Sequence, residues 1–190
     1  MTRRTPLPPA LADRPFSVQQ ARDAGLAASR LRAHDLEIPF RGVREVRSAG
    51  ALTLLDACRR YAPRMKPWQF FSHETALGLR GVPTPRFPYR VGIHVSSHRP
   101  AREPRIGGIV GHRLQTRDDA ATVVDGVRVE DVVRAWRQAA GSWRIDDLIA
   151  AADFLVGRGV LATLDELYAE IRTMRGRRMP ELERALSQVR

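Results

Sequence analysis

The histidines are the residues whose types and spacing come closest to a chemical site. Residues 73–77 begin like the helical zinc-protease motif, but a leucine stands where the second histidine is required. We therefore expect His73 to be structural. His94 and His98 are four residues apart in a strand-and-loop region, where that spacing does not bring both to one side. With His112 they could form a ligand cluster if the two strands that carry them pair.

The sequence contains the beginnings of other catalytic or binding motifs, but each of them lacks an essential residue. Magnesium-dependent nucleases need clustered carboxylates and usually a lysine, yet Lys66 is the one lysine and has no acidic neighbour. Residues 107–111 are glycine-rich but lack the Lys-Ser/Thr that completes a phosphate loop. Cys58 is the single cysteine, which excludes an internal disulfide and a cysteine-rich zinc site. The sequence thus predicts no enzyme, no metal site and no cofactor.

Charge is the strongest feature of the composition. The 190 residues contain 32 Lys plus Arg against 21 Asp plus Glu, which gives a net charge of +11. Residues 1–48 carry +4, residues 49–117 carry +9 and residues 118–190 carry −2. An excess confined to one part of a chain favours an anionic partner for that part. The alternative is a solvated arginine-rich surface with no partner.

The hydrophobic segments bear on the cellular location of the protein. The most apolar stretch, residues 149–156, is far shorter than the roughly 20 residues that span a membrane. Prolines and charges interrupt the N-terminus, which argues against a secretory signal. We expect a cytoplasmic protein with no membrane partner, whose residues 1–15 form a flexible arm.

Residues 16–48 predict a winged helix-turn-helix. Ser17 and Gln20 have the spacing of a capping box, in which each side chain bonds a free backbone N–H of the first helical turn. Gly25 should end this helix, and a second helix is expected over residues 28–35. Pro39 then excludes helix, and residues 40–46 predict a basic hairpin with its turn near Gly42.

The second helix and the hairpin supply the candidate DNA contacts. On the second helix a small hydroxyl, an alanine and two arginines would face the major groove, where arginine can pair with guanine or with phosphate. Arginines of the hairpin would meet phosphates or the minor groove. The full candidate set is Ser17, Gln19, Ser29, Arg30, Arg32, Ala33, Arg41, Arg44 and Arg47. An arginine-rich exterior of two amphipathic helices is the alternative interpretation.

Residues 49–190 predict a mixed α+β domain with a helical end, so the expected fold class is α+β. Helices are expected over residues 51–62, 72–79, 131–139, 145–157, 163–173 and 180–189. Strands are expected over residues 89–96 and 105–114. Asp125 and Gly126 predict a tight hairpin over residues 123–129. Thr163 and Glu166 form a second capping box.

Three groups of residues together resemble a known family. They are residues 16–43 with the Phe-Ser-Val-Gln-Gln opening, residues 72–83 with Ser-His-Glu-Thr-Ala, and residues 152–167 at the helical end. In this order they resemble the AbiEi family, the antitoxins of type IV toxin–antitoxin systems. They are similar also to actinobacterial proteins that join this opening to a domain related to very-short-patch-repair endonucleases. Residues 129–136 depart from the pattern of those relatives.

The resemblance implies a DNA-binding antitoxin or transcriptional autorepressor. Its winged helix would bind operator repeats, and its second domain would counter a nucleotidyltransferase toxin. In the fused relatives the nuclease domain would begin at about residue 190, so we expect none of that activity here. Two alternatives stay open, namely a protein-interaction module that binds a toxin or another partner, and the DNA-targeting part of a truncated or split endonuclease.

Overall fold

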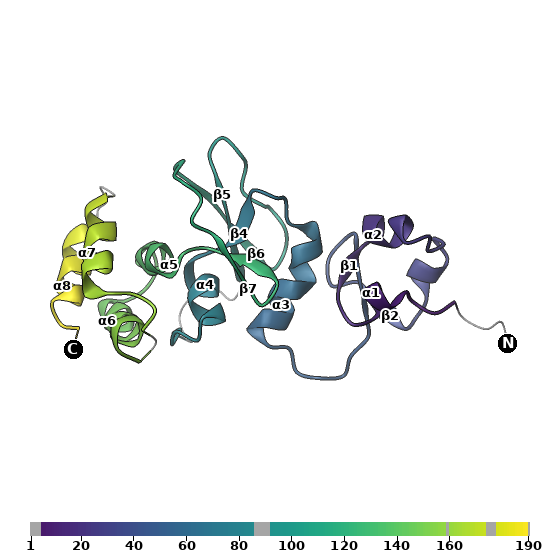
Figure 1. Cartoon of the computed structure of the whole chain (residues 1–190), viewed down its shortest axis with the longest axis horizontal. Coiled ribbons are helices and arrows are strands. Elements are labelled where there is room, and N and C mark those ends of the chain that lie inside the picture. Colours follow the sequence, from purple (N-terminus) through teal and green to yellow (C-terminus); the bar gives the residue numbers. More distant parts are fainter. Residues whose placement is uncertain (1–4, 86–91, 159, 174–177, 190) are drawn as a thin grey trace. The chain divides into compact units, whose positions relative to one another are not determined.

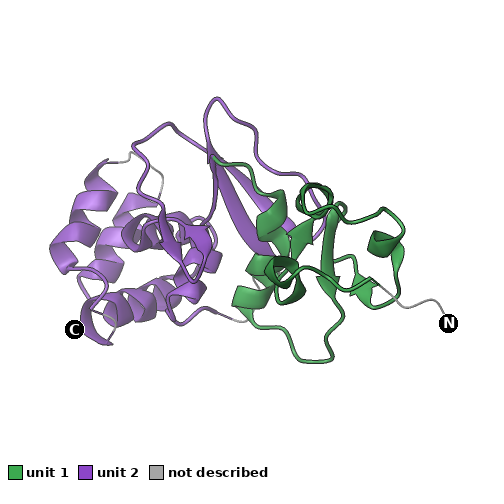
Figure 2. Ribbon diagram, turned by 45° about the vertical axis from the view of Figure 1, so that its right-hand side comes forward, with its two compact units in different colours: residues 1–67 green, residues 68–190 purple. Residues whose placement is uncertain are grey.

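The computed structural model describes residues 5–85, 92–158, 160–173 and 178–189. It divides the chain into two compact units, unit 1 with residues 1–67 and unit 2 with residues 68–190 (Figure 2). Helices and sheets occur in both units, which confirms the α+β class. Every helix among the described residues is too short or too polar to cross a membrane.

Unit 1 is built from short elements around a three-stranded sheet (Figure 1). Strand β3 lies at the centre and pairs antiparallel with β1 on one side and β2 on the other. In chain order the elements are α1 (Pro9–Ala12), β1 (Phe16–Ser17), α2 (Val18–Asp23), a 3-10 helix (Arg30–Arg32), β2 (Leu36–Glu37), β3 (Val43–Val46), α3 (Leu54–Tyr61) and a 3-10 turn (Ala62–Arg64).

The first helix of the predicted helix-turn-helix has the expected ends. The Ser17 hydroxyl accepts a hydrogen bond from the Gln20 backbone N–H, and the Gln20 side chain accepts one from the Ser17 N–H, so the capping box is confirmed. Gly25 follows in the left-handed conformation with φ of 75°, where glycine carries no steric penalty. A hairpin with its loop at Gly42 is also present, but it begins earlier than predicted: its first strand is β2, Leu36–Glu37, and residues 40 and 41 belong to the loop.

Two expectations for unit 1 were wrong. The second helix predicted over residues 28–35 is a single 3-10 turn, because the chain turns at Ala33 and enters β2 at Leu36. Residues 5–15 are also more than an arm, since Leu11 of α1 is buried with Phe16 and Leu31 in the core of this unit. Residues 1–4 lie outside the described part of the chain.

The division after Pro67 also differs from the expected domain boundary after residue 48. Helix α3 joins unit 1 because its side chains contact the hairpin. Arg60 forms ion pairs with Glu37 and Glu45, the latter at 2.7 Å. The Tyr61 ring packs edge-on against Phe40 with ring centres 5.2 Å apart. These contacts connect the arginine-rich helix to the predicted wing.

Unit 2 combines a five-stranded mixed sheet with helices. The strand order is β6-β5-β4-β8-β7, with β4 parallel to β8, β5 parallel to β6 and the other pairs antiparallel. Its elements are β4 (Gln69–Phe71), α4 (His73–Leu79), β5 (Ile93–His98), β6 (Ile109–Leu114), β7 (Thr122–Val124), β8 (Val127–Val129), α5 (Val132–Ala139), α6 (Ile145–Asp153), a π-helical turn (Phe154–Arg158), α7 (Leu164–Thr173) and α8 (Met179–Leu186).

Several local predictions for unit 2 are confirmed. Val124 pairs with Val127 across a two-residue turn in which Asp125 and Gly126 both have positive φ, as a tight Asp-Gly hairpin requires. The capping box at Thr163 forms both of its hydrogen bonds. The strand expected over residues 89–96 occurs as β5, while its first part, residues 89–91, lies outside the described residues.

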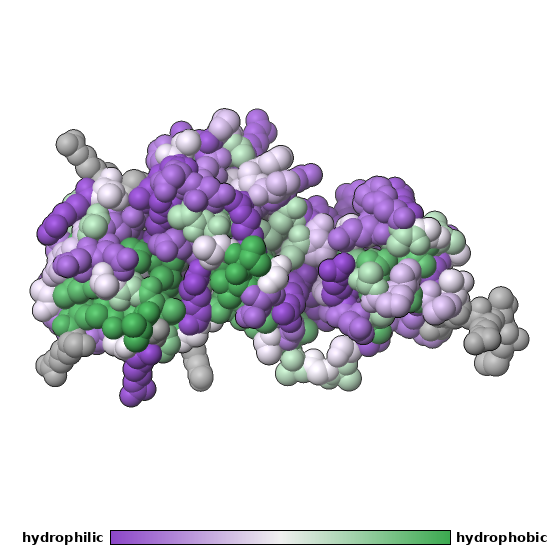
Figure 3. Space-filling view, viewed as in Figure 1, coloured by the Kyte–Doolittle hydropathy of each residue, from purple (hydrophilic) through white to green (hydrophobic). Residues whose placement is uncertain are grey.

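The helices of unit 2 pack around two buried tryptophans. Helix α5 contacts α4, which lies beside the sheet, and also α6 and α7 (Figure 1). Trp136 of α5 is fully buried, and its indole N–H donates to the Leu148 carbonyl of α6 at 3.0 Å. Trp143, between these helices, is buried as well. Figure 3 shows hydrophobic residues gathered over the helical end of this unit, among mostly hydrophilic surroundings.

Candidate functional site

The predicted DNA contacts of unit 1 fall into two groups in the structure. Arg32, Arg41 and Arg47 are exposed, as is Ser29 beside the 3-10 turn, and their side chains are open to solvent. Ala33 is half-buried at the end of that turn. Arg41 lies in the loop between β2 and β3, and Arg47 directly follows β3. These positions keep the accessibility that contact with a phosphate needs.

Arg30 does not have that accessibility. Its residue is 8% exposed, and its guanidinium donates two hydrogen bonds to the Asp35 carboxylate, at 3.0 and 2.8 Å. Its Nε donates a third bond, of 2.7 Å, to the Thr5 carbonyl. A guanidinium that is engaged on both edges cannot pair with a base without breaking these bonds. The prediction that Arg30 reads DNA is corrected accordingly, since Arg30 holds the N-terminal segment onto the 3-10 turn.

We expect Arg30→Ala to destabilise unit 1 by about 2 kcal/mol, because the partly buried Asp35 loses its charge-assisted partners. Amide hydrogen exchange of residues 5–47 should show faster exchange in this variant. Arg32→Ala is the matched control, since it removes the same charge from an exposed position of the same 3-10 turn. Equal exchange in the two variants would contradict the structural role of Arg30.

Three further members of the predicted set also have bonds within unit 1. Arg44 is half-buried and donates to the Leu31 carbonyl at 2.7 Å and to the Val43 carbonyl at 2.9 Å. The Ser17 hydroxyl caps α2, and the exposed Gln19 side chain donates to Asp23 at 2.8 Å. Their first role is therefore to hold the turn, the hairpin and α2 together.

Unit 2 brings three histidines into one cluster. His73, His94 and His112 each offer a ring nitrogen, and these three atoms lie within 4.8 Å of one another. His94 Nδ1 and His112 Nε2 are 3.0 Å apart. The parallel register pairs Ser96 with His112, so His112 lies two positions along β6 from the partner of His94.

His98 is outside the cluster, although it shares β5 with His94. Four residues along a strand span about 13 Å, which is too far for both rings to reach one ion. The His98 ring lies against Phe70, with ring centres 5.1 Å apart. The grouping of His94, His98 and His112, which the sequence allowed only if the two strands pair, is therefore not formed, and His73 takes the place of His98.

The segment between β4 and α4 places His73 beside His94. The Ser72 backbone N–H donates to the His94 carbonyl at 3.0 Å, and the His94 N–H donates to the Thr75 hydroxyl at 2.8 Å. The Ser96 hydroxyl also donates to the Ser72 hydroxyl at 2.6 Å. The start of α4 is thereby fixed to the middle of β5. Ser72 is the residue before α4, but its side chain forms no capping bond, because its hydroxyl is used in these contacts.

Glu74 supports the opposite side of the His94 ring. Its carboxylate lies 2.6 Å from His94 Nε2 and accepts hydrogen bonds from the Ser142 hydroxyl and the Trp143 indole N–H, both at 3.0 Å. Burial alone would raise the pKa of the Glu74 carboxyl, but the bonds to His94, Ser142 and Trp143 lower it below its ordinary value. Glu74 is thus held ionised against one ring nitrogen of His94.

His73 is constrained in backbone and side chain. Its φ is 50°, in the left-handed region that residues with a Cβ rarely adopt. Its ring stacks on His112 with centres 3.6 Å apart and planes inclined by 16°, and its Nδ1 lies 3.0 Å from the Ser72 hydroxyl. Burial, and then the neighbouring His112, His94 and Arg137, lower the pKa of His73 well below 6.5. The ring is neutral at physiological pH.

An arginine-lined cavity adjoins the cluster at His73. It has a volume of about 390 Å³. Its lining includes His73 and the arginines Arg113, Arg117, Arg134, Arg137 and Arg178. The His73 backbone N–H donates to the Gln138 side chain at 3.2 Å, and Gln138 donates to Glu130 at 3.0 Å. This chain of bonds connects the histidine cluster to the wall of the cavity.

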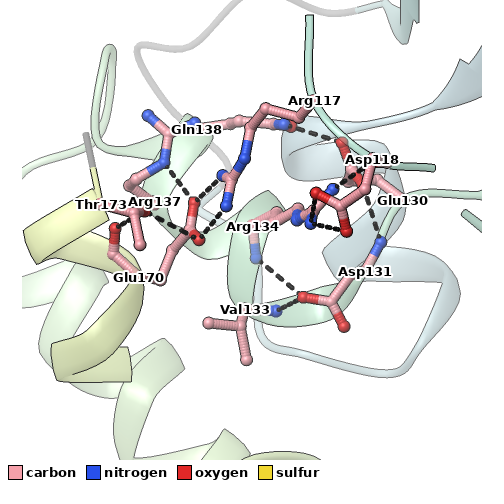
Figure 4. A network of polar contacts seen from close by, with 10 residues as sticks. All are labelled: Arg117, Asp118, Glu130, Asp131, Val133, Arg134, Arg137, Gln138, Glu170 and Thr173. Carbon is pink, nitrogen blue, oxygen red and sulfur yellow. Dashed lines mark hydrogen bonds and ion pairs between the residues drawn. The ribbon is translucent and has the colours of Figure 1, made fainter. Parts of the chain in front are cut away.

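Three arginines of the cavity, Arg117, Arg134 and Arg137, are held by acidic partners (Figure 4). Arg117 donates two bonds to the Glu170 carboxylate, at 2.7 and 3.0 Å, and Arg137 donates a third at 2.7 Å. Arg134 pairs with both carboxylate oxygens of Asp118. Figure 4 shows the guanidinium groups of Arg117 and Arg137 converging on Glu170 from two elements. The cavity wall is therefore preorganised rather than built from loose side chains.

Comparison with known proteins adds no assignment. No protein-family model matches this chain, and no curated protein is significantly similar to it. What the fold defines is an α+β protein of two units, with a basic unit 1 and a histidine cluster in unit 2.

Sequence reasoning missed the role of residues 72–75. Residues 73–77 begin like a zinc-protease helix but lack its second histidine, so the sequence predicted a structural His73. In the structure all four serve the cluster, through the Ser72 hydroxyl, the His73 ring, the Glu74 carboxylate and the Thr75 hydroxyl. One signal for this site was present in the sequence. A run of polar residues lies between a strand and a helix that are both buried.

Proposed function

We propose that this chain is a DNA-binding regulator of the antitoxin type, in which unit 1 contacts the phosphate backbone. The observation that carries this proposal is the charge of unit 1. Residues 1–67 contain 13 basic and 6 acidic residues, a net charge of +7. Arg32, Arg41 and Arg47 within it are exposed. Exposed arginines on a compact basic unit are the usual electrostatic basis of DNA binding.

The order of elements in unit 1 supports the same proposal. A helix, a glycine turn, a helical turn and an antiparallel hairpin follow one another, as expected for a winged helix. The helical turn is too short to enter a major groove as a recognition helix, so contacts from the hairpin gain importance. Arg41 and Arg47 flank β3 and are the side chains to which we assign phosphate contacts. Ser29 and Arg32 remain the candidates for contact with bases.

The test is binding of the full chain to DNA from upstream of its own gene, compared with random DNA of equal length. If unit 1 contacts about four phosphates, affinity should fall about 10²-fold between 50 and 200 mM salt, because each neutralised phosphate releases counterions. Tighter binding to the upstream DNA than to random DNA would support a regulator. No salt-dependent binding to either DNA would overturn the proposal.

Substitution of the hairpin arginines should change the salt dependence. Arg41→Gln and Arg47→Gln should each reduce the slope of log affinity against log salt by about 1, since each removes one phosphate contact. Arg184→Gln, which removes an exposed arginine of α8 in unit 2, should leave the slope unchanged. Equal slopes for all three variants would contradict contact through the hairpin.

A further inference from the structure

We propose that His73, His94 and His112 bind one divalent transition-metal ion, with zinc as the first candidate. The cluster belongs to unit 2 and rests on its own geometry, so the inference does not depend on DNA binding by unit 1. Three imidazole nitrogens are a common ligand set for zinc, and they leave one position of a tetrahedral ion for water or another small ligand.

Two of the three ring pairs have a spacing close to the one that a shared ion requires, since the His94 ring centre lies 5.0 Å from that of His112 and 5.6 Å from that of His73. Two nitrogens bound to a tetrahedral zinc ion at about 2.05 Å are about 3.3 Å apart. His94 Nδ1 and His112 Nε2 are 3.0 Å apart, and no pair of the three ligand atoms is more than 4.8 Å apart. Binding requires the His73 ring to slide off the His112 ring, because their centres are 3.6 Å apart and two imidazoles bound to one tetrahedral ion have centres about 5 Å apart. The pairings of the strands can stay as they are. The parallel register of β5 and β6 and the bonds that fix α4 to β5 already bring the three rings together.

In His94 and His73, the ring nitrogen that would not bind the ion has a partner of the kind found around metal sites. Metal-binding histidines usually donate their second ring N–H to a carboxylate, a carbonyl or a hydroxyl, which fixes the tautomer. Glu74 takes this position for His94 at 2.6 Å, and Ser72 takes it for His73 at 3.0 Å. With the proton of His94 on Nε2 toward Glu74, its Nδ1 lone pair points at His112 and is available to an ion.

Glu74 is itself held in place by the bonds from Ser142 and Trp143. Trp143, Glu74 and His94 thus form a largely buried polar network. Such a network costs free energy unless every polar group in it is paired, so packing alone does not explain its presence. The rare backbone conformation of His73 adds to this, since such strain is concentrated at functional sites. Together these features favour a ligand site over a core histidine.

The chemistry of the donors selects the metal class. Imidazole nitrogen suits zinc, copper, nickel and iron, whereas calcium and magnesium prefer oxygen ligands. The three ligand atoms are all nitrogens, and the Glu74 carboxylate beside them is taken by His94. Magnesium and calcium should therefore bind weakly or not at all.

The experiment uses the full-length, tag-free chain after treatment with a chelator. Titration with zinc, followed by calorimetry, should give one ion per chain. Cobalt(II) should give the intense visible absorption of a tetrahedral site, and zinc should then displace it. Absence of uptake, or cobalt absorption typical of an octahedral aqua ion, would overturn the proposal. These measurements on the unaltered chain do not depend on whether any variant folds.

Substitutions then locate the ion. His94→Ala and His112→Ala should each weaken zinc binding at least 10-fold, and Glu74→Gln should weaken it about 10-fold by releasing the His94 ring. His98→Ala is the matched control on the same strand, and its affinity should equal that of the unaltered chain. Far-UV circular dichroism identifies any variant that fails to fold. Binding that survives in the folded His94→Ala and His112→Ala variants would place the ion elsewhere and overturn the proposal.

Discussion

Gly111→Ala should lower the free energy of unfolding of unit 2 by about 3 kcal/mol. Gly111 lies in β6, and a Cβ added to it would be 2.0 Å from the Pro104 carbonyl oxygen. That oxygen belongs to backbone and cannot rotate away as a flexible side chain would. Either β6 or the segment before it must move, at the cost of strand pairing with β5. The glycine is required here by a close approach of two backbone segments.

Tryptophan fluorescence measures this effect, because Trp68, Trp136 and Trp143 all belong to unit 2. Urea unfolding of the variant should show a lower midpoint with the same slope. Gly107→Ala is the matched control, since its added Cβ meets no atom within 4 Å, and its stability should be unchanged or about 0.5 kcal/mol higher. Equal midpoints for the two variants would contradict the close approach.

Gly111→Ala should also disturb the histidine cluster. His112 is the next residue of β6, so a shift of the strand moves one of the three rings. Zinc affinity should fall in this variant and stay unchanged in Gly107→Ala.

Glu170→Ala should destabilise unit 2 by about 3 kcal/mol. The Glu170 side chain is 6% exposed and accepts two bonds from Arg117 and one from Arg137. Removal of the carboxylate leaves two arginines, each about one-fifth exposed, without their shared partner. Their partial contact with water keeps the loss below that of a fully buried ion pair. Glu183→Ala, on the exposed side of α8, is the control and should change stability by less than about 0.5 kcal/mol.

The contribution of Glu170 should depend on pH in one direction. Burial raises the pKa of its carboxyl, but the bonds from Arg117 and Arg137 outweigh this effect, so the pKa in the folded chain lies below 4.5. Its stabilisation is fully present above pH 4.5 and is lost as the pH falls through the lower folded value. The difference in stability between the unaltered chain and Glu170→Ala should be constant at neutral pH and shrink in acid. A difference that grew in acid would falsify the assignment.

Much of the local structure could be predicted from the sequence. The capping boxes at Ser17 and Thr163, the helix end at Gly25 and the Asp125-Gly126 turn depend on residues three or fewer positions apart. Such bonds are formed by neighbours in the chain, so side-chain chemistry alone specifies them. The order of predicted helices and strands along the chain was also sufficient to predict the α+β fold class.

The predicted DNA contacts show where this reasoning fails. Arginine stands at positions 30, 32, 41, 44 and 47, and helical periodicity places Arg30 on the groove-facing side and Arg32 on its flank. In the structure Arg30 is buried against Asp35 and Thr5, whereas Arg32 is exposed. Whether an arginine is exposed or forms internal hydrogen bonds depends on its neighbours in the tertiary structure. Helical periodicity carries no information about those neighbours.

The caps, the turns, the fold class and the uneven charge could be predicted from the amino-acid sequence. That His73, His94 and His112 form one cluster without His98 became clear only from the way the strands and α4 pack. These histidines come from α4, β5 and β6, and they meet only because β5 pairs parallel with β6 in one register while the Ser72 backbone bonds to β5. Strand register is set by contacts among distant residues, so a one-residue change in pairing would turn His112 to the opposite face of the sheet.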